Sequence, residues 1–597
     1  MIAHTSVMEP GKKPAETAEP RRRMNFNCVF IWILTLVLVG SQVPIFVQQT
    51  LTPDTVLYDL QARCLLNGGV LYRDILEPNL PGIVWVHAIV RSFIGWLSMA
   101  LLVFDLFVVL AIGLLLAKLV RTGAGRSDES QAMIALTLPG VLLFYFGTSE
   151  WCHCQRDTWM LLPCLVAVLI RVKVLQGLKR VDCRLPRFSF QQFGWGTLEG
   201  IFWAIGFWLK PFVAVPALAV QLVSIRYSSG FRSWSLQLLS VLFGGLLTGA
   251  AGIALMVQSG CWTYFWDQLT QWNGDYFQSG RTRWTLDRFV DHAMRFQPWI
   301  WLHVGAIAIS VRQLIAKRTA AAAGKCKDPA VVGNLLGALY LGWILQAFIV
   351  QQLFDYIHVP GVLLAWAICI RSAAAALTAP RPLQTAADDR ATWKTLTLPA
   401  FAAFLCLALV VSPMVRWNRQ QLWLECVQAC SGSALSPQSK DQIAQFPFPR
   451  WTELQPMIEH LREAGIADKA LIAYNGNLIH LYPELGIPPV TRFVYLDVLA
   501  RSFPGRRSEM IAALERSAVR FVVSDLREDG WEGDLPTNGL LPASLADRQS
   551  SLCFPYNQTP VFRSGGYVLF QIDHPVERLS EKYVPLSLLP EGGGNKE

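Results

Sequence analysis

Runs of about twenty apolar residues recur along the first 413 positions of the sequence and limit what the chain can fold into. A helix of that length rises about 30 Å, which is the thickness of the hydrocarbon core of a bilayer. Hydrophobic residues make up 53% of the 597 positions and charged residues only 16%, whereas soluble proteins carry about a quarter charged residues. Much of the surface must therefore face lipid. The net charge of +9 does not indicate a nucleic-acid partner, because Lys and Arg of membrane proteins gather in cytoplasmic loops.

The first apolar run covers residues 26–47 and follows three consecutive arginines at 21–23. A cleaved signal peptide would have a shorter apolar stretch and a small-residue cleavage site, and neither is present. We therefore predict an uncleaved first span, preceded by a cytoplasmic tail over residues 1–25.

Ten further apolar runs follow, at 97–119, 131–148, 159–176, 197–210, 211–225, 235–257, 299–315, 331–350, 359–377 and 395–413. Basic clusters alternate with them, and these clusters contain Lys118, Arg121, Arg126, Arg171, Lys173, Lys179, Arg180, Arg184, Arg187, Arg226, Arg232, Arg312, Lys317, Arg318, Lys325, Lys327, Arg371, Arg381, Arg390 and Lys394. Placing every cluster inside predicts a polytopic α-helical membrane protein with about eleven transmembrane helices and both the first outer loop and the C-terminal tail outside. Residues 80–95 are apolar but short and contain His87 and Arg91, so we predict an interfacial helix there.

The character of the chain changes after residue 413, where charges become frequent and apolar runs short. Residues 470–474 and 520–524 are typical of buried strands, 507–517 has helical spacing, and 561–572 predicts a strand or hairpin around Gly565 and Gly566. Residues 26–413 thus form the transmembrane domain, and 414–597 a small extracytoplasmic α/β domain with a docking or acceptor-binding role. Cys426 and Cys430 lie outside, where a disulfide between them is compatible with the spacing.

The first outer loop, residues 49–96, comes just after a membrane span and has four carboxylates within 24 positions: Asp54, Asp59, Asp74 and Glu77. Pro53 favours a helix start, which puts Asp54 in a first turn. Asp54 also lies at the membrane exit, where the phosphate of a lipid would be. For Asp59 and Asp74, solvated loop charges or helix caps are the better interpretation.

Other outer turns carry charges next to hydrocarbon, where charge is expensive and often functional. Arg156 and Asp157 begin one span, and a mutual salt bridge is as good an interpretation as a site role. Lys210 precedes Pro211 at a break between two runs, where it either neutralises a phosphate or extends to the interface. His358 follows Tyr356 in a third turn and either donates to a phosphate oxygen or caps its own helix.

Two further features need a structural explanation. Cys152, His153 and Cys154 alternate in a way that cannot wrap one ion from a single helix, so we interpret them as coincidence rather than a metal site. Asp105 is a carboxylate within an apolar run and requires a buried partner, which the sequence does not identify.

Taken in order, these residues resemble the GT-C superfamily of membrane glycosyltransferases, in the branch of the protein O-mannosyltransferase, aminoarabinose transferase and RgtA/B/C/D-like enzymes. The resemblance covers roughly residues 26–413 and is carried by Asp54, Tyr58, Gly68, Tyr72-Arg73-Asp74, Pro78-Asn79-Leu80-Pro81, Gln155-Arg156-Asp157, Lys210-Pro211 and Tyr356-x-His358-x-Pro360, and after it by Thr491-Arg492-Phe493. Two elements depart from the family: Asp54-Thr55 stands where many relatives have Asp-Glu, and Asn79-Leu80-Pro81 where they have Lys-Pro-Pro.

The resemblance implies transfer of a sugar from a polyprenyl-phosphate carrier to an acceptor hydroxyl at the outer face of the bacterial cytoplasmic membrane. Lipid phosphate leaves without a proton but needs positive charge, and the acceptor hydroxyl needs a base. The implied roles are Asp54 as base, with inversion at the anomeric carbon, Lys210, Arg156 and His358 as phosphate ligands, and Asp157, Tyr58, Glu77 and Tyr356 as substrate-binding residues. No cofactor is required, although a divalent cation held by Asp54 and Asp157 is compatible with carboxylate chemistry.

Two other classes of function remain open on the sequence alone. A transporter or flippase of lipid-linked sugars would place polar residues at mid-bilayer, often in two related halves, whereas here they lie at the outer rim. A non-catalytic membrane scaffold would account for the C-terminal domain but not for the charged outer turns.

Overall fold

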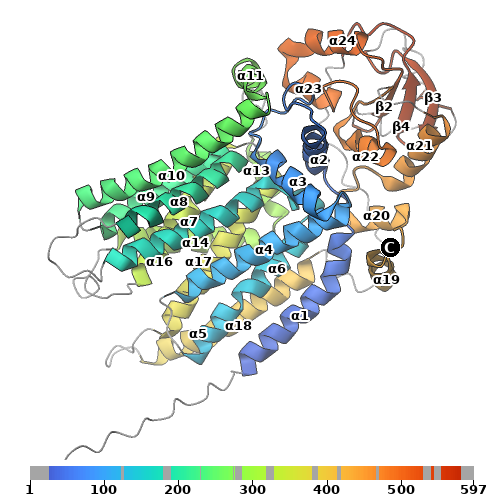
Figure 1. The fold of residues 1–597 in the computed structure, drawn as a ribbon. Coiled ribbons are helices and arrows are strands. Elements are labelled where there is room, and N and C mark those ends of the chain that lie inside the picture. Colours follow the sequence, from blue (N-terminus) through green and yellow to red (C-terminus); the bar gives the residue numbers. More distant parts are fainter. Residues whose placement is uncertain are drawn as a thin grey trace, which may run out of the picture.

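The computed structural model describes residues 26–122, 127–178, 190–228, 230–272, 274–275, 285–316, 329–351, 353–378, 387–412, 419–465, 470–528, 539–542 and 553–579. A bundle of long helices forms one part of the molecule, and a small mixed sheet with short helices covers one end of that bundle (Figure 1). The N-terminal tail 1–25 and half of the residues of the predicted cytoplasmic basic clusters lie outside the described residues, so the predicted orientation stays a prediction.

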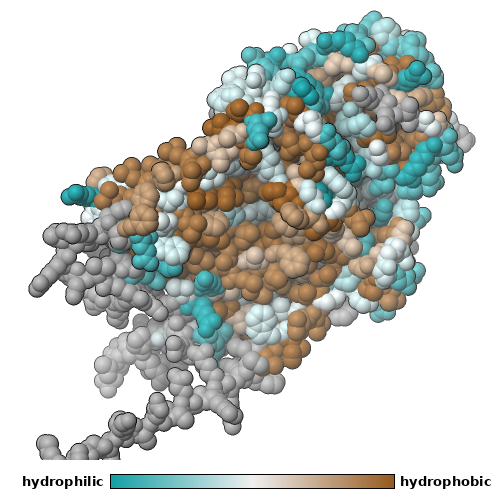
Figure 2. All heavy atoms as spheres, viewed as in Figure 1, coloured by the Kyte–Doolittle hydropathy of each residue, from teal (hydrophilic) through white to brown (hydrophobic). Residues whose placement is uncertain are grey.

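The bundle is built from helices that fall on the predicted apolar runs. They are α1 (Phe26–Val47), α4 (Ser98–Arg121), α5 (Asp128–Ala135), α6 (Thr137–Gly147), α7 (Arg156–Leu178), α8 (Phe190–Leu209), α9 (Ala214–Ser224), α10 (Phe231–Gln258), α14 (Leu302–Ile315), α16 (Pro329–Leu345), α17 (His358–Thr378) and α18 (Ala387–Val411). Apolar residues dominate the visible face of this bundle, and hydrophilic residues gather over the domain with the small sheet (Figure 2).

Within the described residues, seven helices are long and apolar enough to cross a membrane, and the number is eight if one bent pair forms a single span. The bent pair joins α13 (Leu286–Met294) to the helix that ends at Ile315 with an angle of 113°. Two more predicted runs coincide with shorter apolar helices, Pro211–Tyr227 and Leu396–Val411. The chain is therefore a multi-pass helical protein, and the number eleven stays a prediction.

The predicted interfacial helix is α3 (Gly82–Ile94), whose 13 residues rise only about 20 Å, too little to cross a bilayer. Two of its side chains hold α2 (Pro53–Leu66), because His87 Nδ1 and Arg91 Nε lie 2.8 and 2.9 Å from Asp59 Oδ1. The prediction that Asp59 is a solvated loop charge was therefore wrong. Asp59 is the acceptor in a largely buried ion pair. Asp74 does lie near the surface, paired with Arg73 at 2.7 Å.

The segment after the bundle contains α19 (Gln420–Cys430), α20 (Pro437–Ile443), α21 (Trp451–Glu463), α22 (Leu481–Leu485), α23 (Leu496–Ser502), α24 (Arg507–Glu515) and the strands β1 (Leu471–Ala473), β2 (Phe521–Asp525), β3 (Thr559–Ser564) and β4 (Tyr567–Gln571). The sheet order is β1-β2-β4-β3, with β1 and β2 parallel and the other pairs antiparallel. Both predicted strands, the predicted helix and the hairpin at Gly565 and Gly566 are confirmed. Cys426 and Cys430 are free thiols on α19, so the disulfide is not formed.

Two arginines that we grouped with the cytoplasmic clusters have structural partners inside the bundle. Arg371 donates to the carbonyl oxygens at the end of α4, including Leu119 O at 3.0 Å and Thr122 O at 2.7 Å. Arg171 of α7 is fully buried and lies 2.9 Å from the buried carboxylate of Glu199 on α8. Gln237 and Gln221 bond the same pair at 3.0 and 2.7 Å.

Replacing Arg171 by Met is expected to destabilise the bundle by about 3–5 kcal/mol, because Glu199 would remain buried without its counter-charge. The double variant Arg171→Met with Glu199→Met removes both charges and is expected to recover most of that loss. Thermal unfolding of the purified protein in detergent measures both effects. Equal melting temperatures for the single and the double variant would contradict this interpretation.

Candidate active site

The site begins where α2 begins. Thr52 is the N-cap residue, its Oγ1 accepts a hydrogen bond from Thr55 N at 3.3 Å, and Pro53 occupies the first helical position. Thr and Pro are favoured at those two positions. Asp54 therefore lies in the first turn, as predicted, with its side chain half-buried. It makes no hydrogen bond to any side chain that the structure describes.

The second outer turn is bonded to the start of α2. Gln155 Nε2 donates to Thr52 Oγ1 at 3.3 Å, and the next two residues, Arg156 and Asp157, open α7. Cys154, just before them, has a φ of 54°, an uncommon backbone conformation for a residue other than glycine. This short turn fixes where Arg156 enters the bundle.

Lys210 reaches the same place from the break between α8 and η2 (Pro211–Val213). The backbone of Lys210 is extended, and Pro211 starts the next helical segment, as the sequence predicted. Lys210 Nζ lies 2.9 and 2.7 Å from the two carboxylate oxygens of Asp157 and also bonds to Gln351 Oε1. All three ammonium hydrogens thus have an acceptor.

The charges of these residues act on one another. Burial raises the pKa of Asp54, while the positive charges of Arg156 and Lys210 oppose that rise and the negative charge of Asp157 adds to it. A carboxylate with a raised pKa is a stronger base than an ordinary one. Asp54, Arg156, Asp157 and Lys210 therefore form one electrostatic group, at the predicted outer end of the bundle.

Arg156 is the cation of this group that has no direct partner. Its side chain is only 7% exposed, yet it donates no hydrogen bond to a residue within the described ranges. The groups whose charges act on it are Tyr58, Tyr356, Asp157 and Glu77. Tyr356 also lies under the neighbouring cation, since its ring centroid is 5.5 Å from Lys210 Nζ. Seven of the eight predicted site residues are thus brought together.

Glu77 approaches from the same outer loop as Asp54 and is 4% exposed. Burial raises its pKa to about 7, although Arg156 and a hydrogen bond from Asn79 act against the rise. The loop is held by Tyr72, whose hydroxyl donates to Asn79 O at 2.9 Å and whose φ is 66°. Unusual backbone conformations of this kind are common at functional sites.

His358, the eighth residue, lies in a neighbouring cluster. Its ring lies 4.9 Å from the ring of Phe296 and 5.1 Å from that of Phe348, and neither ring nitrogen has a hydrogen-bond partner within the part of the chain that the structure describes. The charged neighbours of His358 are Asp355, His303 and His292 rather than Asp54 or Lys210. Its role as a phosphate donor stays a prediction.

The divalent cation that the sequence allowed between Asp54 and Asp157 stays a prediction. No group of three or more His, Cys, Asp or Glu side chains among them could hold one. Both oxygens of Asp157 accept from Lys210, which leaves Asp54 alone of the predicted pair. His153, between the two cysteines, instead lies 2.6 Å from Gln49 Oε1, and burial lowers its pKa to about 4. We assign no step to a cation.

Asp105 has the buried partners that the sequence required but could not identify. Tyr145 and Trp159 donate to its two carboxylate oxygens at 2.7 and 2.6 Å. These donors come from α6 and α7, so Asp105 joins three helices of the bundle. It belongs to the packing that supports the site rather than to the charged group itself.

The C-terminal domain contacts the site, which the sequence did not predict. Leu76 N, one residue before Glu77, donates to Arg492 O at 2.9 Å. The short helix η8 (Gly476–His480) packs against α2. The segment between the bundle and the sheet is also held, because Glu150 accepts from Gln445 N and Phe446 N at 3.0 and 2.8 Å.

Two solved structures illustrate what the chain is similar to. AglB, an archaeal oligosaccharyltransferase from Archaeoglobus fulgidus solved with an inhibitory peptide and a dolichol-phosphate, is 13% identical, with a TM-score of 0.42 over 84% of this chain and 69% of that chain. ArnT from Cupriavidus metallidurans bound to undecaprenyl phosphate is 13% identical, with a TM-score of 0.46 over 92% and 99%. No family model and no curated protein matches this chain. Similarities of this size say nothing about the reaction, which has to be inferred from the residues.

Proposed function

We propose that this chain is a membrane glycosyltransferase that moves a sugar from a polyprenyl-phosphate carrier to an acceptor hydroxyl at the outer face of the cytoplasmic membrane. Three features support the proposal: the site lies at the end of an apolar bundle, it contains a carboxylate without a hydrogen-bond donor among the described residues, and it contains two buried cations. The resemblance of the motifs to the GT-C superfamily points to the same chemistry.

The observation that carries the proposal is the state of Arg156. Arg156 is 7% exposed as a residue, and within the described residues no acceptor bonds to its guanidinium, so the donors of that group are available to a ligand. Its planar fork matches two oxygens of a phosphate. A phosphate attached to a membrane lipid would reach it from the bilayer, because Arg156 is the first residue of α7, a predicted span.

The reaction needs one proton transfer and one leaving group. The acceptor oxygen attacks the anomeric carbon, the bond from that carbon to the phosphate oxygen breaks, and the acceptor proton moves to Asp54. The bonding electrons leave with the phosphate, whose added negative charge Arg156 stabilises by hydrogen bonds. Because one direct displacement occurs, the configuration at the anomeric carbon inverts.

Lys210 and Asp157 support this step without meeting the leaving group directly. The ammonium of Lys210 is fully bonded to Asp157 and Gln351, so it acts on the phosphate through its charge. Asp157 holds that charge in place, and the tyrosines 58 and 356 lie around Arg156 and limit access of water. Partly buried charges in such surroundings act more strongly than in bulk water.

Turnover of a labelled donor tests the proposed function. The purified full chain in lipid nanodiscs is incubated with undecaprenyl phosphate carrying a radiolabelled hexose, pentose or aminopentose and with an extract of bacterial envelope glycans and lipids as the source of the acceptor hydroxyl, and the release of free undecaprenyl phosphate is followed. We expect enzyme-dependent release with at least one donor. A flippase would move the lipid-linked sugar to the other side of the membrane without breaking the sugar–phosphate bond. Intact lipid with all three donors would therefore refute the proposal.

The pH dependence of donor binding tests the position of Glu77. As pH rises through about 7, Glu77 loses its proton and becomes a negative neighbour that competes with phosphate for Arg156. We therefore expect the donor KM to rise about three- to tenfold between pH 6 and pH 8, since one pKa unit of coupling is a factor of ten. In Glu77→Gln the donor KM is expected to stay low and flat. A wild-type slope that persists in the variant would assign it to another group.

A further inference from the structure

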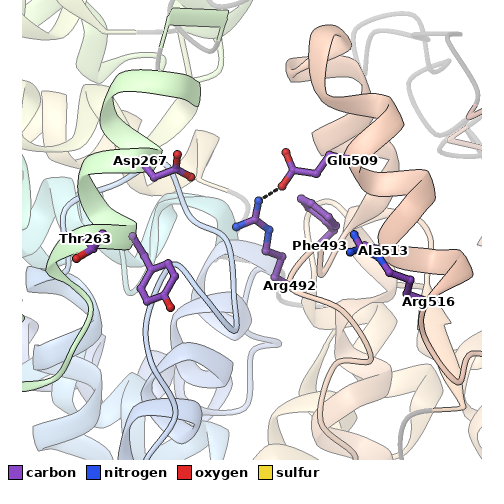
Figure 3. Close-up of a pocket in the computed structure, with 8 residues that line it drawn as sticks. Thr263, Asp267, Arg492, Phe493, Glu509, Ala513 and Arg516 are labelled. Atoms are coloured by element: carbon purple, nitrogen blue, oxygen red, sulfur yellow. Dashed lines mark hydrogen bonds and ion pairs between the residues drawn. The ribbon is translucent and has the colours of Figure 1, made fainter.

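An open cleft separates α11 (Trp262–Asp267) from the C-terminal domain. It encloses about 570 Å³ and is lined by Thr263, Tyr264, Asp267, Arg492, Phe493, Glu509, Ala513 and Arg516. In Figure 3, Thr263 and Asp267 project from the green helix on one side, and Arg492 and Glu509 face them from the other. Ligand-binding clefts are commonly 300–1,000 Å³, so a cleft of this volume has room for a small oligosaccharide.

The lining mixes apolar surface with polar groups and carries no net formal charge, because the two arginines balance Asp267 and Glu509. Arg492 and Glu509 form an ion pair with each other. Arg516 donates to Ala512 O at 2.9 Å through Nε and forms no ion pair among the described residues, and Asp267 accepts no hydrogen bond among them. Among the described residues, Arg516 thus has no ion-pair partner and Asp267 has no hydrogen-bond donor, and these two side chains lie on opposite walls of the cleft.

Two contacts join the walls of the cleft to the loop that carries Glu77. On the domain side, Arg492 O bonds to Leu76 N at 2.9 Å, and the next residue is Glu77. On the side of α11, the ring of Phe265 lies 5.6 Å from that of Tyr72, which in turn bonds to Asn79. Both walls of the cleft therefore contact the loop that carries Glu77.

We propose that this cleft binds the acceptor and that the acceptor is a neutral saccharide; this inference rests on the proposed function. Sugar hydroxyls both donate and accept hydrogen bonds, so they satisfy a carboxylate on one wall and a guanidinium on the other at the same time. The ring of Tyr264, which is 37% exposed, offers an apolar face to a pyranose. An acceptor with several negative charges would gain no attraction from a lining whose charges cancel.

The experiment uses the full chain, a donor that is turned over, and a panel of neutral trisaccharides built from glucose, mannose, galactose or N-acetylglucosamine, with an oligogalacturonic trimer and a short threonine-containing peptide beside them. Release of free undecaprenyl phosphate is measured against the concentration of each acceptor. We expect saturable stimulation by at least one neutral saccharide. Asp267→Ala and Ala513→Trp are expected to raise its KM about tenfold, as the loss of a charged hydrogen bond or a blocked cleft would, with the donor KM unchanged.

The matched control is Glu515→Gln, a charge on the same helix as Ala513 that does not line the cleft; it should leave both KM values unchanged. Stimulation only by the acidic trimer or only by the peptide would overturn the saccharide assignment. An unchanged acceptor KM in both cleft variants, or no saturation with any neutral saccharide, would overturn the site. Failure of the proposed function is a different result, because the donor would then stay intact with every acceptor, including the envelope extract.

Discussion

Replacing Asp54 by Asn is expected to lower the turnover number about 10²- to 10⁴-fold, the usual contribution of a positioned general base. The amide keeps the size of the carboxyl but cannot take the acceptor proton. Wild-type turnover should fall as pH decreases, because the base works only when deprotonated, and the raised pKa of Asp54 shifts that fall toward neutral pH. In Asp54→Asn the residual turnover should not depend on this ionisation.

The matched control for this prediction is Asp74→Asn, on the same outer loop. Asp74 is paired with the exposed Arg73 and is remote from the charged group in our mechanism, so turnover should stay within about twofold of wild type, as for most surface substitutions. Initial rates at saturating donor across a pH series measure both variants. Full turnover in Asp54→Asn would leave the enzyme class open but remove Asp54 as the base.

Replacing Arg156 by Gln is expected to lower kcat/KM for the donor about 10²- to 10³-fold, as losses of charge-stabilising donors do in other enzymes. Arg156 makes no hydrogen bond to a described residue, so its removal leaves no described acceptor without its donor, and the protein should remain folded. The same variant should raise the pKa of Asp54 and of Glu77 further, because Arg156 lowers both. The acid limb of the rate profile should move to higher pH.

Arg156→Lys and Arg462→Gln complete this test. Lysine keeps the charge but lacks the planar fork, so its loss should be smaller than that of Gln. Arg462 is a half-exposed arginine of the C-terminal domain, and its replacement should have no effect on donor kinetics. Equal donor kinetics for wild type and Arg156→Gln would exclude Arg156 as the phosphate ligand.

The helices and strands were largely predictable from the sequence, because each depends on a local pattern. Apolar runs located the bundle, Pro53 located the start of α2, and Pro211 located the break after Lys210. The pattern of basic clusters did not reveal that Arg171 and Arg371 bond to partners inside the bundle. A cluster of basic residues does not reveal which member turns inward, since that depends on a partner such as Glu199 on another helix.

The site was predictable to the extent that its residues lie in outer turns of the chain. Asp54, Arg156 and Lys210 share one end of the bundle for that reason. Their pairing was not predictable: Lys210 bonds to Asp157 and Gln351, whereas Arg156 is left without a hydrogen bond among the described residues. His358 lies in the expected turn, yet its ring packs between phenylalanines, because its direction depends on tertiary packing.

The contacts of the C-terminal domain were the least predictable part. The motif Thr491-Arg492-Phe493 marked this stretch by resemblance alone, but Arg492 meets the loop through its backbone carbonyl, an atom that every residue has, so the sequence did not reveal the contact. Tyr264 and Asp267 are exposed polar residues of an outer segment, and nothing in their spacing distinguishes them from solvated side chains. Only the fold shows that they face Arg492 and Glu509 across a cleft.

The hydrogen bond between Leu76 N and Arg492 O has a consequence for the synthesis and membrane insertion of the chain. The loop that carries Glu77 is made early in translation, but the residue that holds it is made near the end. The bundle can therefore insert long before this contact exists. Under the proposed function, a chain that ends before residue 492 would span the membrane with the Glu77 loop untethered, and we expect it to turn over the lipid-linked donor more slowly than the full chain.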